Sequence, residues 1–123
     1  MKKYLILLAL IPSLLQGQTC HPCAEIAGHR GKSDISLKEL SSLKTLEVGG
    51  SCPGAKVISF EFTMKVKGNP TSYLGVGTGV SSDMKKLISM ASKNQKLFFD
   101  NVRAKFPDGS IKSIPGITLV VKD

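Results

Sequence analysis

The sequence predicts a mainly β fold, an immunoglobulin-like β-sandwich with one or two short helices. Within the stretch from Val57 to Lys67, apolar and polar residues alternate from Ile58 onward, which is the pattern of a strand with one buried face. A Pro-Asp-Gly turn at 107–109 joins two further β-prone stretches. About 105 residues remain after the N-terminal leader described next, enough for one domain of this class.

The N-terminus has the three-part order of a secretory signal peptide. Lys2 and Lys3 precede an apolar stretch, Tyr4–Leu15, and a short polar stretch follows. The apolar stretch is shorter than the roughly 20 residues that a membrane-spanning helix needs. We therefore assign residues 1–18 to the signal peptide and expect an exported protein, periplasmic or secreted. The alternative is a lipoprotein signal with lipid on Cys20, although Gly17-Gln18-Thr19 makes a poor lipobox.

Residues 19–34 are expected to form a Cys-bearing lead, and residues 35–123 the β-domain. Pro22, Gly28 and Gly31 oppose regular structure between Thr19 and Lys32. The domain then opens on a short helix, because Ser36-Leu37-Lys38-Glu39 matches the capping box. Leucines follow at about one helical turn, at positions 37, 40, 43 and 46.

The clearest strand is the alternating stretch from Val57 to Lys67. Its solvent face carries Glu61 and Lys65. Its expected buried face consists of Ile58, Phe60, Phe62, Met64 and Val66.

A glycine-rich loop is predicted next, from Gly68 to Val80. Ser81 or Ser82 can cap the helix that follows, and Asn94 suits its left-handed C-terminal end. The apolar face of this helix consists of Met84, Leu87, Ile88 and Ala91.

Two strands are predicted to complete the domain, Lys96–Phe106 and Ser110–Lys122. Pro115-Gly116 interrupts the second strand and indicates an edge position, a bend or a bulge.

The stretch from Lys56 to Lys122 resembles the C-terminal domain of the GldM family. The residues that carry the resemblance are VISFEFTMKVKG (57–68), SDMKKLI (82–88) and KLFFDNVRAKFPDGSIKSIPGITLVVK (96–122). The resemblance implies an immunoglobulin-like sandwich that makes protein–protein contacts in the periplasm, in the type IX secretion and gliding apparatus of Bacteroidetes. GldM-like proteins carry a membrane anchor and further domains before this one. We therefore expect a stand-alone copy of the terminal module here.

Three cysteines follow the signal peptide: Cys20, Cys23 and Cys52. In an oxidising compartment we expect Cys52 to bond either Cys20 or Cys23 and leave one thiol free. One alternative is a thiol-redox protein that uses Cys20-His21-Pro22-Cys23. Another is a zinc site made of Cys20, Cys23, His29 and Cys52.

The charge pattern favours a protein partner over nucleic acid. Loss of Lys2 and Lys3 leaves 15 basic residues against 9 acidic ones, a net charge of +6. These charges are dispersed, without a basic cluster or an aromatic stacking set, and we expect an acidic cell-envelope protein as partner. No nucleophile motif involves either histidine, so we expect a binding or assembly module that is not an enzyme and needs no cofactor. The candidate contact residues are Lys67, Asn69, Tyr73, Lys105, Asp108 and Gly109.

Overall fold

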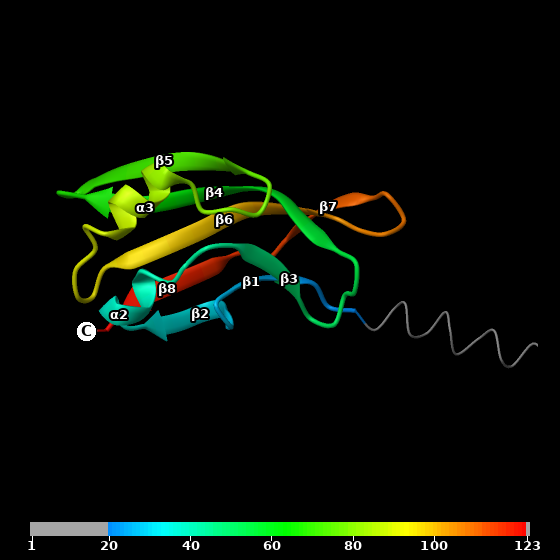
Figure 1. Ribbon diagram of the computed structural model, residues 1–123, viewed down its shortest axis with the longest axis horizontal. Coiled ribbons are helices and arrows are strands. Elements are labelled where there is room, and N and C mark those ends of the chain that lie inside the picture. The colour runs from blue at the N-terminus through cyan, green and yellow to red at the C-terminus, as the bar shows by residue number, and fades with distance from the viewer. Residues whose placement is uncertain (1–19, 123) are drawn as a thin grey trace, which may run out of the picture.

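The structure is a computed structural model that describes residues 20–122. The predicted signal peptide, residues 1–18, lies outside the described residues. Within them, the chain forms one sheet in the order β3-β1-β2-β8-β6-β4-β5, and β7 pairs with β6 (Figure 1). The strands are β1 (Cys23–Ile26), β2 (His29–Ile35), β3 (Leu46–Gly49), β4 (Lys56–Val66), β5 (Asn69–Val76), β6 (Lys96–Lys105), β7 (Ile111–Ile114) and β8 (Ile117–Val121).

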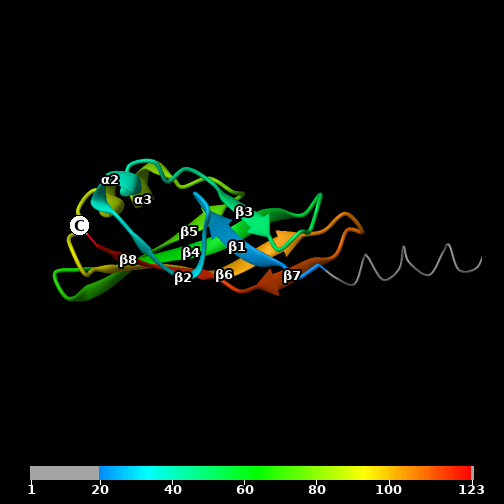
Figure 2. The same ribbon diagram turned by 90° about the horizontal axis from the view of Figure 1, so that it is seen from below.

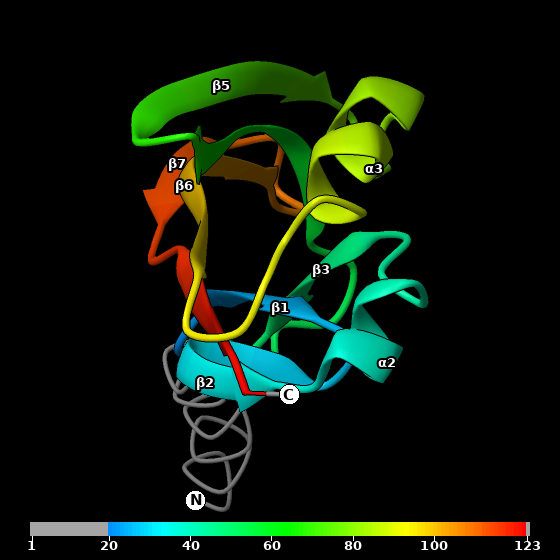
Figure 3. The same cartoon turned by 90° about the vertical axis from the view of Figure 1, so that its left-hand side faces the viewer.

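The sheet curls so that its two ends face each other. Viewed along the long axis, β4 and β5 lie opposite β1, β2 and β3, and the short helices α2 (Leu37–Leu40) and α3 (Ser82–Ile88) cover the open side (Figure 3). Both helices lie at the same end of the molecule (Figure 2), and Leu40 of α2 and Ile88 of α3 line the same depression. The prediction of a mainly β fold with two short helices is confirmed. The two facing layers are parts of one continuous sheet.

Backbone contacts also join the two ends of the curl. The Leu46 N–H donates to the Thr78 carbonyl and the Val80 N–H to the Lys44 carbonyl, each at 2.8 Å. The segment between β5 and α3 is thereby bonded to the start of β3.

Aromatic side chains fill the centre of the curl. Phe60, Phe62 and Met64 on β4 are buried as predicted, and the Phe99 ring lies 6.0 Å from the Phe60 ring and 5.1 Å from the Phe62 ring, centre to centre. The predicted burial of Ile58 is wrong, because Val57 is buried and Ile58 only half-buried.

A bulge causes this change of face. The β4–β6 register shifts on both sides of position 59, which reverses the alternation at the start of β4. Val66 at the other end is half-buried. Glu61, which was predicted to be exposed, is half-buried and accepts a hydrogen bond from Asn101 Nδ2 at 2.8 Å.

The predicted irregular structure from Thr19 to Lys32 is wrong. β1 and β2 lie there, and Ala24 and Ile26 are in the hydrophobic core. Pro22 precedes β1, Gly28 lies in the turn after it, and Gly31 (φ +60°) lies within β2. These residues mark turns and bends between paired segments. Residues 19–34 are thus no separate lead, because β2 pairs in parallel with β8 of the same sheet.

The predicted loop from Gly68 to Val80 is also wrong over most of its length, because β5 occupies it. Lys67 and Gly68 both have positive φ (+53° and +83°) and form a two-residue turn between β4 and β5. Gly75 is buried within β5, where a side chain would collide with the Phe60 ring. The glycine there makes room for the core and does not indicate a loop.

Both helices begin at the predicted caps. Ser36 and Glu39 form the capping box of α2, and the Ser81 hydroxyl accepts from the Met84 N–H at the start of α3. The leucine pattern continues past α2, which ends at Leu40, so Leu46 lies on β3. The predicted C-cap at Asn94 is wrong. Asn94 is left-handed (φ +73°) but lies beyond the end of α3, in the loop before β6.

The strand that follows the Pro-Asp-Gly turn is interrupted at Pro115-Gly116, as predicted. β7 pairs with residues 102–105 of β6, and β8 pairs with residues 96–99. Pro115-Gly116 lies between them, and a side chain at Gly116 would collide with the Phe99 carbonyl. The interruption is therefore a bend that passes the chain from one half of β6 to the other.

Candidate interaction surfaces

The predicted contact residues lie at opposite ends of the molecule. Lys67 lies in the β4–β5 turn and Asn69 directly after it, whereas Lys105, Asp108 and Gly109 belong to the β6–β7 hairpin (Figure 1). Lys105 pairs with the first residue of β4 and Asn69 with the last, so roughly 35 Å of strand separates the two groups. They do not form one surface.

The remaining predicted contact residue, Tyr73, lies in the middle of β5. Within residues 20–122 this strand pairs only with β4 and forms one edge of the sheet. Tyr73 is 37% exposed, Leu74 80% and Val76 91%. Half of the exposed large hydrophobic side chains of residues 20–122 are therefore on one edge strand, the others being Leu37, Met90 and Ile111.

Leu74 and Val76 were not among the predicted contact residues, because three glycines nearby indicated a loop. The available signal was the β-prone stretch Thr71-Ser72-Tyr73-Leu74 directly after a turn. Thr63 and Ser72 confirm the pairing of β4 with β5, since their hydroxyl oxygens are 2.8 Å apart across the two strands.

The cysteines gather at the other end of the molecule. Cys20 and Cys52 form a disulfide with a Cα–Cα distance of 5.2 Å, which confirms that Cys52 bonds one member of the Cys20/Cys23 pair. Cys23 is half-buried and outside the disulfide. A bonded Cys20 has no sulfur valence left for a lipid thioether, so this disulfide and the lipoprotein alternative exclude each other.

The same disulfide does not fit the two alternatives for the cysteines. The dithiol pair needed for the redox alternative is Cys20 with Cys23, and the bonded pair is Cys20 with Cys52. The zinc alternative needs His29, which contacts Glu39 instead. Between residues 20 and 122, no three His, Cys, Asp or Glu side chains are grouped so that they could hold a metal ion.

A shallow depression of about 550 Å³ lies beside the disulfide. The Lys112 ammonium lies 5.4 Å from the centre of the Phe106 ring on one side of it. The Ser110 hydroxyl and N–H both donate to Asp108, and these hydrogen bonds lower the pKa of the Asp108 carboxyl. The lining residues are Cys20, Pro22, Ser51, Cys52, Pro53, Phe106, Pro107, Asp108, Ser110 and Lys112. Asp108 is thus part of a rigid turn, and Gly109 follows it with φ +90°.

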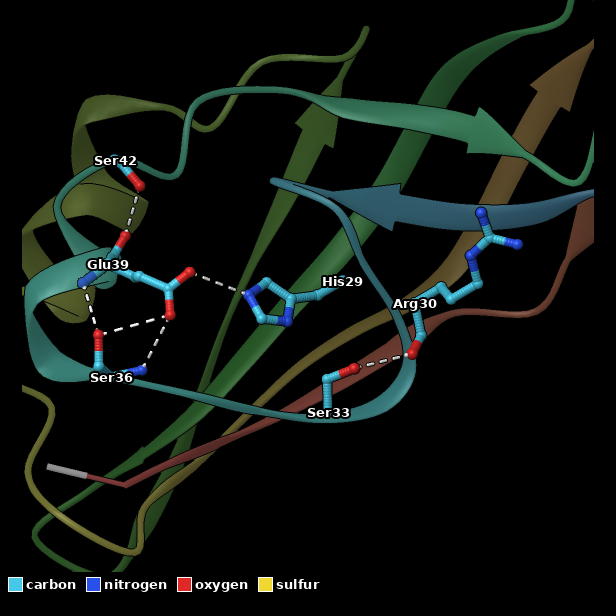
Figure 4. Close-up of polar contacts among 6 residues, drawn as sticks. All are labelled: His29, Arg30, Ser33, Ser36, Glu39 and Ser42. Carbon is cyan, nitrogen blue, oxygen red and sulfur yellow. Dashed lines mark hydrogen bonds and ion pairs between the residues drawn. The ribbon is translucent and has the colours of Figure 1, made fainter.

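A polar cluster links β2 to α2 (Figure 4). His29 Nε2 lies 3.3 Å from one carboxylate oxygen of Glu39, whose other oxygen lies 3.5 Å from the Ser36 hydroxyl and from the Ser36 N–H. The hydrogen bond with His29 and then the one from the Ser36 backbone lower the pKa of Glu39. The carboxylate lies between the serine and the histidine, so His29 does not contact the Ser36 hydroxyl as a general base must. The cluster caps a helix and fastens it to the sheet.

Comparison with models of known protein families found no match, and comparison with curated proteins found none. Among residues 20–122, the helices are all too short or too polar to cross a membrane.

Proposed function

We propose that the chain is an exported, non-catalytic protein-binding module whose contact surface is centred on β5. The observation that carries this proposal is the exposure of Leu74 and Val76 on a sheet edge. Aliphatic side chains gathered on an edge strand favour association, and proteins that do not use such an edge usually carry a charge there. No charged residue lies between Gly68 and Ser82.

The disulfide supports export, because disulfides persist in oxidising compartments and not in the reducing cytosol. The resemblance to the GldM terminal domain supports a setting in the cell envelope, beside the type IX secretion or gliding machinery. The stretch that carries this resemblance, residues 56–122, contains β4, β5, α3, β6, β7 and β8.

A capture experiment tests the proposal. The chain from Thr19 onward is immobilised and exposed to solubilised native cell envelopes, and captured proteins are identified by mass spectrometry after crosslinking. We expect a defined partner that the wild-type chain and Ile111→Lys retain and that Leu74→Lys loses. Ile111 is the matched control, because it is an exposed aliphatic residue on a different strand, β7. Equal capture by both variants would contradict a contact surface on β5.

A further inference from the structure

We infer that β5 accepts an added strand from its partner, an extended apolar segment flanked by acidic residues. This inference rests on the proposed function and names the mode of binding and the chemistry of the partner.

The register of β5 against β4 determines which backbone N–H and C=O groups of β5 have no partner on β4. Lys67 and Gly68 form the two-residue turn, so Val66 and Asn69 close it as a hydrogen-bonded pair. Backbone groups alternate in direction along a strand. Odd-numbered residues of β5 therefore bond to β4, and even-numbered ones present their N–H and C=O groups outward. At the far end, the Gly77 N–H donates to the Ile58 carbonyl at 2.7 Å, which agrees with this assignment.

The outward positions are Pro70, Ser72, Leu74 and Val76. Proline has no N–H, so Pro70 offers no donor to an added strand at the first outward position. Ser72, Leu74 and Val76 then offer three successive donors and acceptors, a template for about five residues of partner strand. The two most exposed apolar side chains of β5 belong to two of these three residues. The free backbone groups and the exposed apolar side chains thus occur at the same positions.

Basic side chains lie near both ends of this template, and two acidic ones, Glu61 and Asp100, lie level with its middle. Lys65 pairs with Pro70 and Lys67 lies in the turn beside it, whereas Arg103 pairs with Ser59, the register partner of Val76. Glu61, the register partner of Leu74, is already bonded to Asn101. A strand with acidic residues beyond both ends of an apolar centre therefore meets opposite charges at both ends.

The same charges disfavour a second copy of this chain as the occupant. Antiparallel pairing of two β5 strands about Leu74 would bring the Lys67 turn of one copy toward the Arg103 end of the other. In the symmetric pair this approach of basic groups to basic groups would occur twice. Each of the two chains also carries an excess of positive charge.

Binding of a synthetic peptide tests this inference. The probe alternates valine and threonine and carries aspartates at both ends, and its control has the same sequence with the amides of one edge N-methylated. We expect the first peptide to slow amide hydrogen exchange at Ser72, Leu74 and Val76. We expect the methylated peptide to bind more than about tenfold more weakly, because it lacks the backbone donors.

Substitutions separate backbone pairing from nonspecific adhesion. Leu74→Lys should weaken peptide binding, and Ile111→Lys should leave it unchanged. Equal binding of both peptides, or protection at the β6–β7 hairpin instead of β5, would overturn strand addition. A dimer of the free chain that Leu74→Lys dissociates would also overturn it, by assigning the edge to a second copy. If the envelope partner is captured through β5 but the peptide protects no β5 amide, the proposed function stands and strand addition fails.

Discussion

The ring of Phe60 occupies the space that a side chain at Gly75 would need. The two residues are register partners on β4 and β5, and a β-carbon at position 75 would collide with the Phe60 ring. The glycine therefore allows the edge strand to lie over a large core aromatic. This contact connects the packing of the core to the strand that we propose as the interaction site.

Gly75→Ala should destabilise the fold by about 1–3 kcal/mol, as overpacked cores do, and should loosen β5 first. Thermal or urea unfolding measures the loss, and amide exchange locates it. Gly79→Ala is the matched control, because no atom lies within 4 Å of the added carbon there and φ is not positive. An equal loss of stability in both variants would mean that the lost flexibility of glycine, and not contact with Phe60, is responsible.

Phe60→Ala should lower the free energy of unfolding by about 3–5 kcal/mol, because it empties part of the aromatic cluster with Phe62 and Phe99. Urea titration followed by circular dichroism measures the change. A near-neutral result would contradict the register of β4 described above.

A chain that starts at Leu37 should fail to fold. It lacks β1 and β2 and with them the buried side chains of Ala24, Ile26 and Ile35. Circular dichroism and the dispersion of amide NMR signals measure the outcome, and the chain from Thr19 onward is the control. A folded truncated chain that retains partner capture would show that residues 19–36 are a dispensable lead after all.

Cys52→Ser should destabilise the exported protein by about 3 kcal/mol, because the disulfide with Cys20 closes a loop of 32 residues. Cys23→Ser should have a much smaller effect, since Cys23 is outside that bond. Mass spectrometry of unreduced peptides should find Cys20 linked to Cys52. A Cys20–Cys23 link with catalysed disulfide reduction would favour the thiol-redox alternative.

We expect the α2 region to lose stability at low pH because of Glu39. Its hydrogen bonds with His29 and Ser36 lower its pKa in the folded state below the ordinary value of 4.5. The stabilisation is therefore complete above that value and is lost as the pH falls through the lowered pKa. The stability difference between wild type and Glu39→Gln should shrink on acidification, in urea titrations from about pH 6 to about pH 3. Glu47→Gln on β3 is the exposed control, and parallel curves for the two variants would contradict a specific role of Glu39.

Elements whose signals are local could be predicted from the amino-acid sequence. The alternation in β4, the serine caps of both helices and the Pro-Asp-Gly turn each depend on residues within a few positions of one another. The sequence also restricted the disulfide to Cys52 with one of two cysteines. The candidate contacts at Lys67, Asn69 and Tyr73 lie on or beside β5, although their segment was predicted as a loop.

The two glycine-containing segments that form β1–β2 and β5 could be assigned as strands only from the three-dimensional pairing of the sheet. β2 is stabilised by β8, far along the chain, and β5 by its hairpin partner β4, whose Phe60 ring lies beneath Gly75. Ile58 likewise faces away from the core because of a bulge against β6. A glycine locally indicates flexibility, whereas Gly75 gives space to the Phe60 ring, and that ring lies beside it only once β4 and β5 have paired in this register.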